Sequence, residues 1–81
     1  MKLNIRLFAA IKARAETSQL SIEISEPATV SDLLDELFRQ YPTIQPFVQT
    51  VLVAVNQEYV NRSQLINPGD EIALFPPVSG G

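Results

Sequence analysis

The chain has 81 residues, 46% of them hydrophobic and 19% charged, with a net charge of −3 at pH 7, which is the balance of a single small globular domain. It contains no cysteine and no histidine, which excludes disulfides, thiol nucleophiles, imidazole bases and the usual zinc ligands. We therefore do not expect an enzyme that acts by itself.

Charge and hydropathy also limit the partners. The basic residues are scattered and form no stripe that could neutralise phosphates, so nucleic acid is not an expected partner: Lys2, Arg6, Lys12, Arg14, Arg39 and Arg62. No apolar run approaches ~18 residues and the N-terminus has no signal-peptide pattern, which predicts a cytoplasmic protein without a membrane partner. The glycines form no phosphate loop, so we expect no cofactor on this chain.

The N-terminal part predicts two strands around a short helix. Residues 2–8 alternate apolar and polar side chains, which predicts a half-buried strand that carries Phe8 on its polar face. Residues 9–15 are rich in helix formers and predict a short helical connection. Residues 20–24 alternate again, so the two strands are expected to pair as a wide hairpin.

The strongest helical pattern begins at Thr29. This residue can cap the helix together with Asp32, and Pro42 ends it. One broad apolar stripe follows the helical period and must pack on a sheet: Val30, Leu33, Leu34, Leu37, Phe38 and Tyr41. The carboxylates of Asp35 and Glu36 indicate a solvated helix face rather than a catalytic pair, because no third group supports catalysis.

The C-terminal half predicts three strands separated by turns. The expected elements are a loop over 43–50, a strand over 51–55 buried on both faces or central, a turn over 56–58, a short strand over 59–60, a turn over 67–70 and a strand over 71–75. In the last strand, Ile72 and Leu74 point inward and Phe75 points outward.

This order of elements predicts an α+β domain over residues 1–75: a ubiquitin-like β-grasp fold, in which a mixed sheet packs on one main helix. If the first and last strands are parallel neighbours, Phe8 and Phe75 meet on the uncovered face, and Tyr59 can join them. We interpret this group as a protein docking surface. The alternative is that these are the scattered exposed apolar residues found on most proteins.

Residues 76–81 predict a flexible, extended tail. Pro76 and Pro77 have no N–H donor and stop the pairing of the last strand. Gly80 and Gly81 have no side chains, so the backbone can enter a narrow channel. The candidate reactive group is the α-carboxylate of Gly81, which another protein would activate, most simply as an acyl-adenylate made with ATP. The alternative is a frayed chain end.

Three stretches together resemble the small subunit of molybdopterin synthase: Leu7-Phe8-Ala9, Pro68-Gly69-Asp70-Glu71-Ile72 and Phe75-Pro76-Pro77-Val78-Ser79-Gly80-Gly81. The resemblance covers essentially the whole chain. It implies a β-grasp sulfur carrier whose terminal glycine is adenylated by an ATP-dependent adenylyltransferase similar to the ubiquitin activators, and then converted to a thiocarboxylate. The large catalytic subunit would pass this sulfur to cyclic pyranopterin monophosphate during molybdenum cofactor biosynthesis.

The same resemblance assigns roles by position. Gly81 corresponds to the thiocarboxylated residue and Gly80 to the residue that gives channel access. The partner-binding residues are Phe8, Tyr59, Phe75, Pro76, Pro77, Val78 and Ser79. The resemblance further implies that the chain is the sulfur-donating subunit of a two-subunit sulfurtransferase, a heterotetramer. A thiamine-type sulfur carrier and a ubiquitin-like modifier that forms isopeptide bonds through Gly81 are the alternatives.

Overall fold

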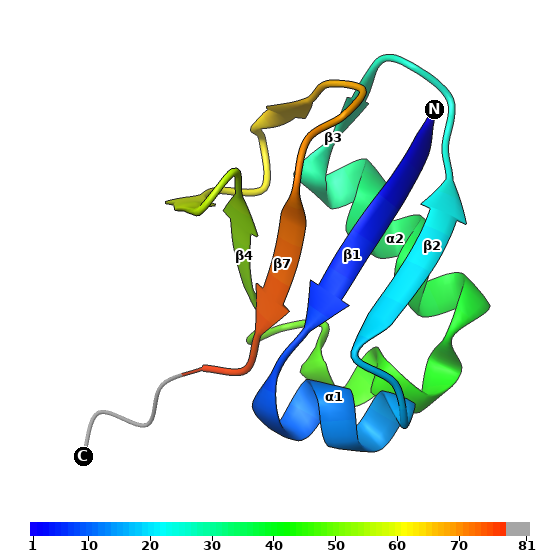
Figure 1. The fold of residues 1–81 in the computed structure, drawn as a ribbon, viewed down its shortest axis with the longest axis vertical. Coiled ribbons are helices and arrows are strands. Elements are labelled where there is room, and N and C mark those ends of the chain that lie inside the picture. Colours follow the sequence, from blue (N-terminus) through cyan, green and yellow to red (C-terminus); the bar gives the residue numbers. More distant parts are fainter. Residues whose placement is uncertain (78–81) are drawn as a thin grey trace.

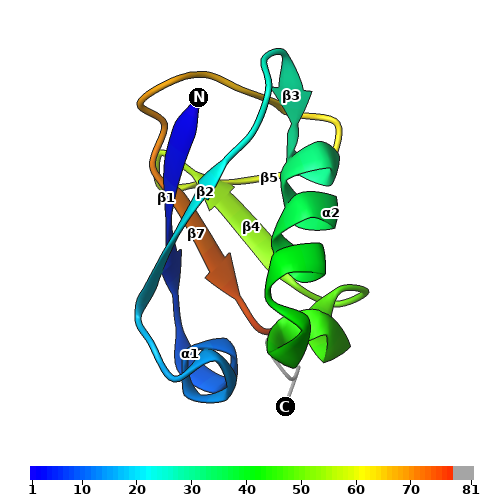
Figure 2. The same ribbon diagram turned by 90° about the vertical axis from the view of Figure 1, so that its right-hand side faces the viewer.

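The computed structural model describes residues 1–77, in which a five-stranded mixed sheet packs against one long helix and two short strands form a second sheet. Figure 1 shows the sheet in front of helix α2 (Val30–Gln40), and Figure 2 shows that this helix covers one face only. The main sheet has the order β2-β1-β7-β4-β5, with strands β1 (Lys2–Leu7), β2 (Gln19–Glu23), β4 (Leu52–Val55), β5 (Glu58–Val60) and β7 (Ile72–Phe75).

The pairing of the strands agrees with the sequence analysis. β1 and β2 form the predicted antiparallel hairpin, connected through helix α1 (Ala9–Ala15). β1 and β7 are parallel neighbours, with Ile5 opposite Ile72 and Leu7 opposite Leu74. β4 pairs antiparallel with β7 on one side and with β5 on the other. The first and last strands therefore are parallel neighbours, which is the condition under which Phe8 and Phe75 were expected to meet.

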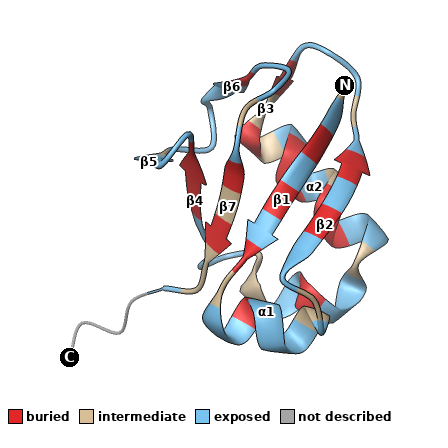
Figure 3. Cartoon of the chain, in the orientation of Figure 1, coloured by how far each residue is buried: buried red, intermediate tan, exposed pale blue. Residues whose placement is uncertain are grey.

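The inward-facing side chains of the strands, which alternate with exposed ones, form one half of the core. Leu3, Ile5 and Leu7 are buried between exposed neighbours in β1, and Ile72 and Leu74 are buried in β7. Figure 3 shows this alternation of buried and exposed residues along the strands. The apolar stripe of α2 supplies the other half, because Val30, Leu33, Leu34, Leu37 and Phe38 are all buried, whereas Tyr41 lies at the helix C-cap and is only half-buried.

The N-terminus of α2 is capped as predicted. The Thr29 hydroxyl accepts a hydrogen bond from the Asp32 N–H at 3.2 Å, and the Asp32 carboxylate accepts one from the Thr29 N–H at 2.9 Å. The N–H groups of Val30 and Ser31 donate to backbone carbonyls of the loop that follows β5, at 2.9 Å each. Four N–H groups at or just before the first turn are thus satisfied.

Two expectations need correction. A second sheet pairs β3 (Ala28–Thr29) with β6 (Leu65–Ile66), and neither strand was predicted. The expected loop over 43–50 contains a 3₁₀ helix, η1 (Pro42–Phe47), which buries Ile44. The strand expected over 51–55 to be buried on both faces or central is β4, which pairs with a strand on each side and leaves Leu52 36% exposed.

The last strand of the sheet ends at Phe75, and the division into a domain over 1–75 and a tail over 76–81 stays a prediction. β7 ends at Phe75, and Pro76 and Pro77 have no regular structure. Residues 78–81 lie outside the part that the structure describes, so the extended, flexible tail over 76–81 stays a prediction.

Candidate docking surface

Three aromatic side chains meet on the face of the sheet that α2 leaves uncovered. We call Phe8, Tyr59 and Phe75 the aromatic cluster. The Phe8 and Phe75 rings are stacked, with centroids 4.6 Å apart and planes 9° apart. The Tyr59 ring meets Phe75 edge-on, with centroids 5.8 Å apart and planes 71° apart. Both arrangements are favoured for aromatic pairs, so the predicted juxtaposition of these three residues is confirmed.

The register of the sheet explains why the rings meet. Leu7 and Leu74 are opposite each other in the parallel β1–β7 pair and both point into the core. Because side chains alternate between the two faces, the next residues, Phe8 and Phe75, fall on the open side. β5 adds the third ring, since Tyr59 pairs with Ala54 of β4.

Local backbone geometry helps to place two of the rings. Ala9, directly after Phe8, has a φ of 52° and turns the chain from β1 into α1. This is an unusual conformation for a residue with a Cβ atom. The hairpin that carries Tyr59 turns over two residues with positive φ, Asn56 at 53° and Gln57 at 71°, the geometry of a tight type I′ turn.

The cluster borders a groove of about 270 Å³. Ala54 and Ala73 contribute to its floor from the central strands, and Arg6 and Glu71 add charged groups to its lining. The Arg6 guanidinium carbon lies 5.6 Å from the centroid of the Phe8 ring, within the range of a cation–π contact. The surface is therefore apolar with a charged margin.

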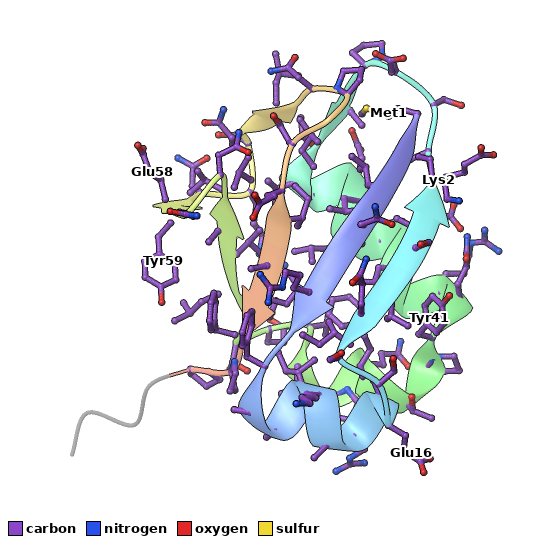
Figure 4. All side chains as sticks on the ribbon, viewed as in Figure 1. Met1, Lys2, Glu16, Tyr41, Glu58 and Tyr59 are labelled. Atoms are coloured by element: carbon purple, nitrogen blue, oxygen red, sulfur yellow. The ribbon has the colours of Figure 1, made fainter. Side chains whose placement is uncertain are left out.

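Exposure differs within the cluster. Tyr59 is 67% exposed, whereas Phe8 and Phe75 are half-buried, each partly covered by its stacking partner. In Figure 4 the Tyr59 side chain projects from β5 toward the end of the molecule at which the chain leaves β7. An exposed aromatic ring beside half-buried ones is a combination that a partner protein can cover.

Sequence analysis missed several residues of this face. Ala54 and Arg6 line the groove, and Leu52 lies opposite Phe75 in the β4–β7 pair. The sequence signal that could have placed Leu52 and Ala54 is the alternation of side chains between the two faces of a strand, which puts them on the face opposite Val53. It was hidden because residues 51–55 are all apolar.

The predicted tail residues are only partly described. Pro76 is half-buried and Pro77 is exposed, directly after the aromatic cluster. Val78, Ser79, Gly80 and Gly81, including both predicted reactive residues, lie outside the described residues. The structure therefore describes the first two residues of the predicted tail, Pro76 and Pro77, and the surface beside them.

The carboxylates of α2 are placed as a solvated face. Gln40 donates to the Glu36 carboxylate at 3.0 Å and Arg39 pairs with the same group. The Gln40 hydrogen bond, followed by the hydrogen bond and charge of Arg39, holds the pKa of Glu36 below its ordinary value. This agrees with the prediction that Asp35 and Glu36 lie on a solvated helix face.

Residues 1–77 contain no group of three or more His, Cys, Asp or Glu side chains placed to hold a metal ion. Within the same range no helix is long and apolar enough to cross a membrane. The cytoplasmic location remains a prediction from the sequence.

Comparison with known proteins identifies the family. Residues 5–81 match the model of the ThiS family. The chain belongs to the ThiS family. Among ThiS-like relatives, the molybdopterin synthase sulfur carrier subunit of Dictyostelium discoideum is 40% identical, over 99% of this chain and 96% of its own length. The subunit of the same name from Mycobacterium tuberculosis is 35% identical, over 100% of this chain and 99% of its own.

A solved structure of a similar chain supports the fold. The crystal structure of SAMP1 from Haloferax volcanii matches with a TM-score of 0.88 at 31% identity, over 100% of both chains. The fold is therefore the ubiquitin-like β-grasp predicted from the order of the elements. The resemblance to the small subunit of molybdopterin synthase is likewise confirmed.

Proposed function

We propose that this ThiS family protein is the sulfur carrier subunit of a molybdopterin synthase. The observation that carries the proposal is the position of the aromatic cluster: Phe75 ends β7 within it, and the chain continues directly into Pro-Pro-Val-Ser-Gly-Gly. A partner that covers the cluster would receive the tail at a fixed point. Relatives that match over the full chain carry this function in their names, which supports the same reading.

The proposed chemistry takes place at Gly81. An adenylyltransferase similar to the ubiquitin activators would use ATP to convert the terminal carboxylate to an acyl-adenylate, because a free carboxylate is a poor electrophile. Sulfur would then replace the adenylate and leave a thiocarboxylate. Gly80 and Gly81 suit this role because neither has a Cβ atom to obstruct a narrow channel.

The thiocarboxylate would be used in the large catalytic subunit. We propose that the aromatic cluster docks on that subunit, and that Pro76, Pro77, Val78 and Ser79 lead the terminus into its active site. There the sulfur would pass to cyclic pyranopterin monophosphate. The carrier itself needs no nucleophile or nucleotide pocket in this scheme, and its sequence indeed offers no Cys or His.

A reconstituted synthase tests the proposal. Deletion of Gly81 is expected to abolish sulfur transfer to the pterin without lowering the melting temperature, because the core of the domain lies within residues 1–77. Transfer is measured as pterin product formed from the carrier, the large subunit, the activating enzyme, ATP and a sulfur source. Comparable product from the truncated and full-length chains would refute the carrier role.

The same preparation tests the main alternative. A ubiquitin-like modifier would form isopeptide bonds with lysine side chains. Such conjugates would appear as larger bands on reducing gels when lysate proteins are added, and they would survive thiol reductants. Their formation in the absence of pterin product would favour the modifier over the carrier.

A further inference from the structure

A side-chain network joins two turns at the end of the sheet where β7 begins. Asn56, the first residue of the β4–β5 turn, accepts a hydrogen bond from the Glu71 N–H through Oδ1 at 3.0 Å. Its Nδ2 donates to Oδ1 of Asp70 at 3.0 Å. The other carboxylate oxygen of Asp70 accepts from the Asn67 N–H at 2.8 Å. One asparagine thus connects the hairpin to the residues that lead into β7.

The orientation of the Asn56 amide is fixed by its partners. A backbone N–H can only donate, so the atom that faces Glu71 must be the oxygen. The nitrogen then faces Asp70, whose ionised carboxylate can only accept. The backbone of Asn56 adds a third bond, from its own N–H to the Glu71 carbonyl at 2.8 Å. We call these contacts among Asn56, Asp70 and Glu71 the asparagine clamp.

Two separate properties make asparagine suitable at this position. With a φ of 53°, residue 56 favours Gly, Asn or Asp, and glycine alone would satisfy the turn. The clamp additionally needs a short side chain with one donor and one acceptor. Glycine has neither and aspartate has no donor at neutral pH. The turn therefore explains the positive φ of residue 56, but it does not explain why the residue is asparagine and not glycine.

The clamp lies directly before β7. β7 has only four residues, and its first, Ile72, directly follows the clamped Glu71. A shift of one residue in this strand would send Phe75 to the covered face, because side chains alternate with a period of 2. The hairpin on the other side of the clamp carries Tyr59, on an edge strand of three residues.

We propose that Asn56 is a positioning residue of the docking surface, whose side chain clamps the hairpin to the start of β7 and so holds the aromatic cluster in its binding geometry. It acts through the rings and touches no partner. The expected effect on partner binding rests on the proposed function, whereas the effect on the rings does not.

The first test separates the turn from the clamp. Asn56→Gly preserves the left-handed turn and removes both side-chain bonds. In the free protein we expect weaker NMR cross-peaks between the Tyr59 and Phe75 rings. Gln57→Gly is the matched control, because it places glycine at the neighbouring positive-φ position of the same turn and leaves the clamp intact, so the cross-peaks should persist. Gln57 lines the groove, so this control is measured by the ring cross-peaks and not by partner binding. Unchanged cross-peaks in Asn56→Gly, even with a lower melting temperature, would overturn the proposal.

The second test exchanges donor and acceptor. N56D places two carboxylates against each other, and D70N leaves the Asn56 amide without its acceptor. In N56D/D70N the amide at position 70 can donate to the carboxylate at position 56, while both backbone N–H groups keep an acceptor. We expect each single variant to weaken the ring cross-peaks and the double variant to restore them. Simple addition of the two defects would contradict the clamp.

Binding to the large synthase subunit of the same organism provides the functional measurement. Well below the melting temperature, Asn56→Gly should raise Kd about tenfold, the equivalent of one to two hydrogen bonds, and N56D/D70N should recover most of that loss. If the unmodified chain does not bind, the proposed function fails and the ring cross-peaks still decide the role of Asn56. If it binds and Asn56→Gly binds equally well, only the positioning role is refuted.

Discussion

Adjacent residues of β7 have opposite tasks. Leu74 is fully buried between the sheet and the helix, whereas Phe75 stacks on Phe8 at the surface. Burial of the Leu74 side chain therefore stabilises the folded state. The Phe75 ring is only partly buried and remains available to a partner protein. This division can be tested one residue at a time.

Phe75→Ala is expected to weaken binding to the large subunit by about 2 kcal/mol, roughly thirtyfold in Kd, because it removes the central ring of the cluster. Its free energy of unfolding should fall far less than that of Leu74→Ala, for which a loss of about 2–5 kcal/mol is expected. Titration calorimetry and urea denaturation of both variants give the two quantities. If Phe75→Ala strongly lowered the free energy of unfolding and left the affinity for the large subunit unchanged, the aromatic cluster would have to be assigned to the core and not to a docking surface.

The sequence predicts on which face of the sheet a side chain lies only where apolar and polar residues clearly alternate. Phe8 and Phe75 could be placed on the open face because each follows a strand with clear alternation. Leu52 could not, since it stands in an uninterrupted apolar run. The asparagine clamp was also out of reach, because hydrogen bonds between residues 14 and 15 positions apart depend on the folded geometry.

Helix α2 begins where its capping residues place it. Thr29 and Asp32 exchange side-chain and backbone hydrogen bonds, so the start of the helix is fixed by two residues. Thr29→Ala should therefore lower the free energy of unfolding by about 1 kcal/mol. Ser31→Ala is the matched control, because the Ser31 hydroxyl makes no hydrogen bond within the described part of the chain.

Chemical denaturation of both variants measures the difference. The capping account predicts that Thr29→Ala unfolds at a clearly lower urea concentration and that Ser31→Ala remains close to the unmodified protein. Equal stability of the two variants would mean that the carbonyls of the loop after β5, which accept from the first N–H groups of the helix, suffice to start it.

Elements that follow a period were predictable, and those that depend on tertiary contacts were not. β1, β2 and α2 show periods over five or more residues. β3 and β6 have two residues each, too few to show a period, and form because they pair with each other. In η1, Pro42 was interpreted only as the end of a helix, although proline is also favoured in the first turn of the next one.

At the scale of the whole molecule, the described residues form one packed domain, and the proposed chemistry takes place at the terminus beyond it. α2 covers one face of the sheet (Figure 2), and the two form one core. The uncovered face carries the aromatic cluster beside the end of β7. The strand order that brings β1 beside β7 is what brings Phe8 to Phe75. In this account the functional task of the β-grasp body is to start the proposed reactive tail, at Pro76, directly beside a docking surface.

The most direct test is the intact mass of the chain after incubation with the activating enzyme, ATP and a sulfur source. The account predicts a gain equal to the replacement of one oxygen by sulfur, localised to the C-terminal peptide and absent when ATP is omitted or Gly81 is deleted. A positive control is another carrier protein that the same activating enzyme charges in the same assay. An unchanged mass of this chain, when the control carrier is charged, would contradict the account.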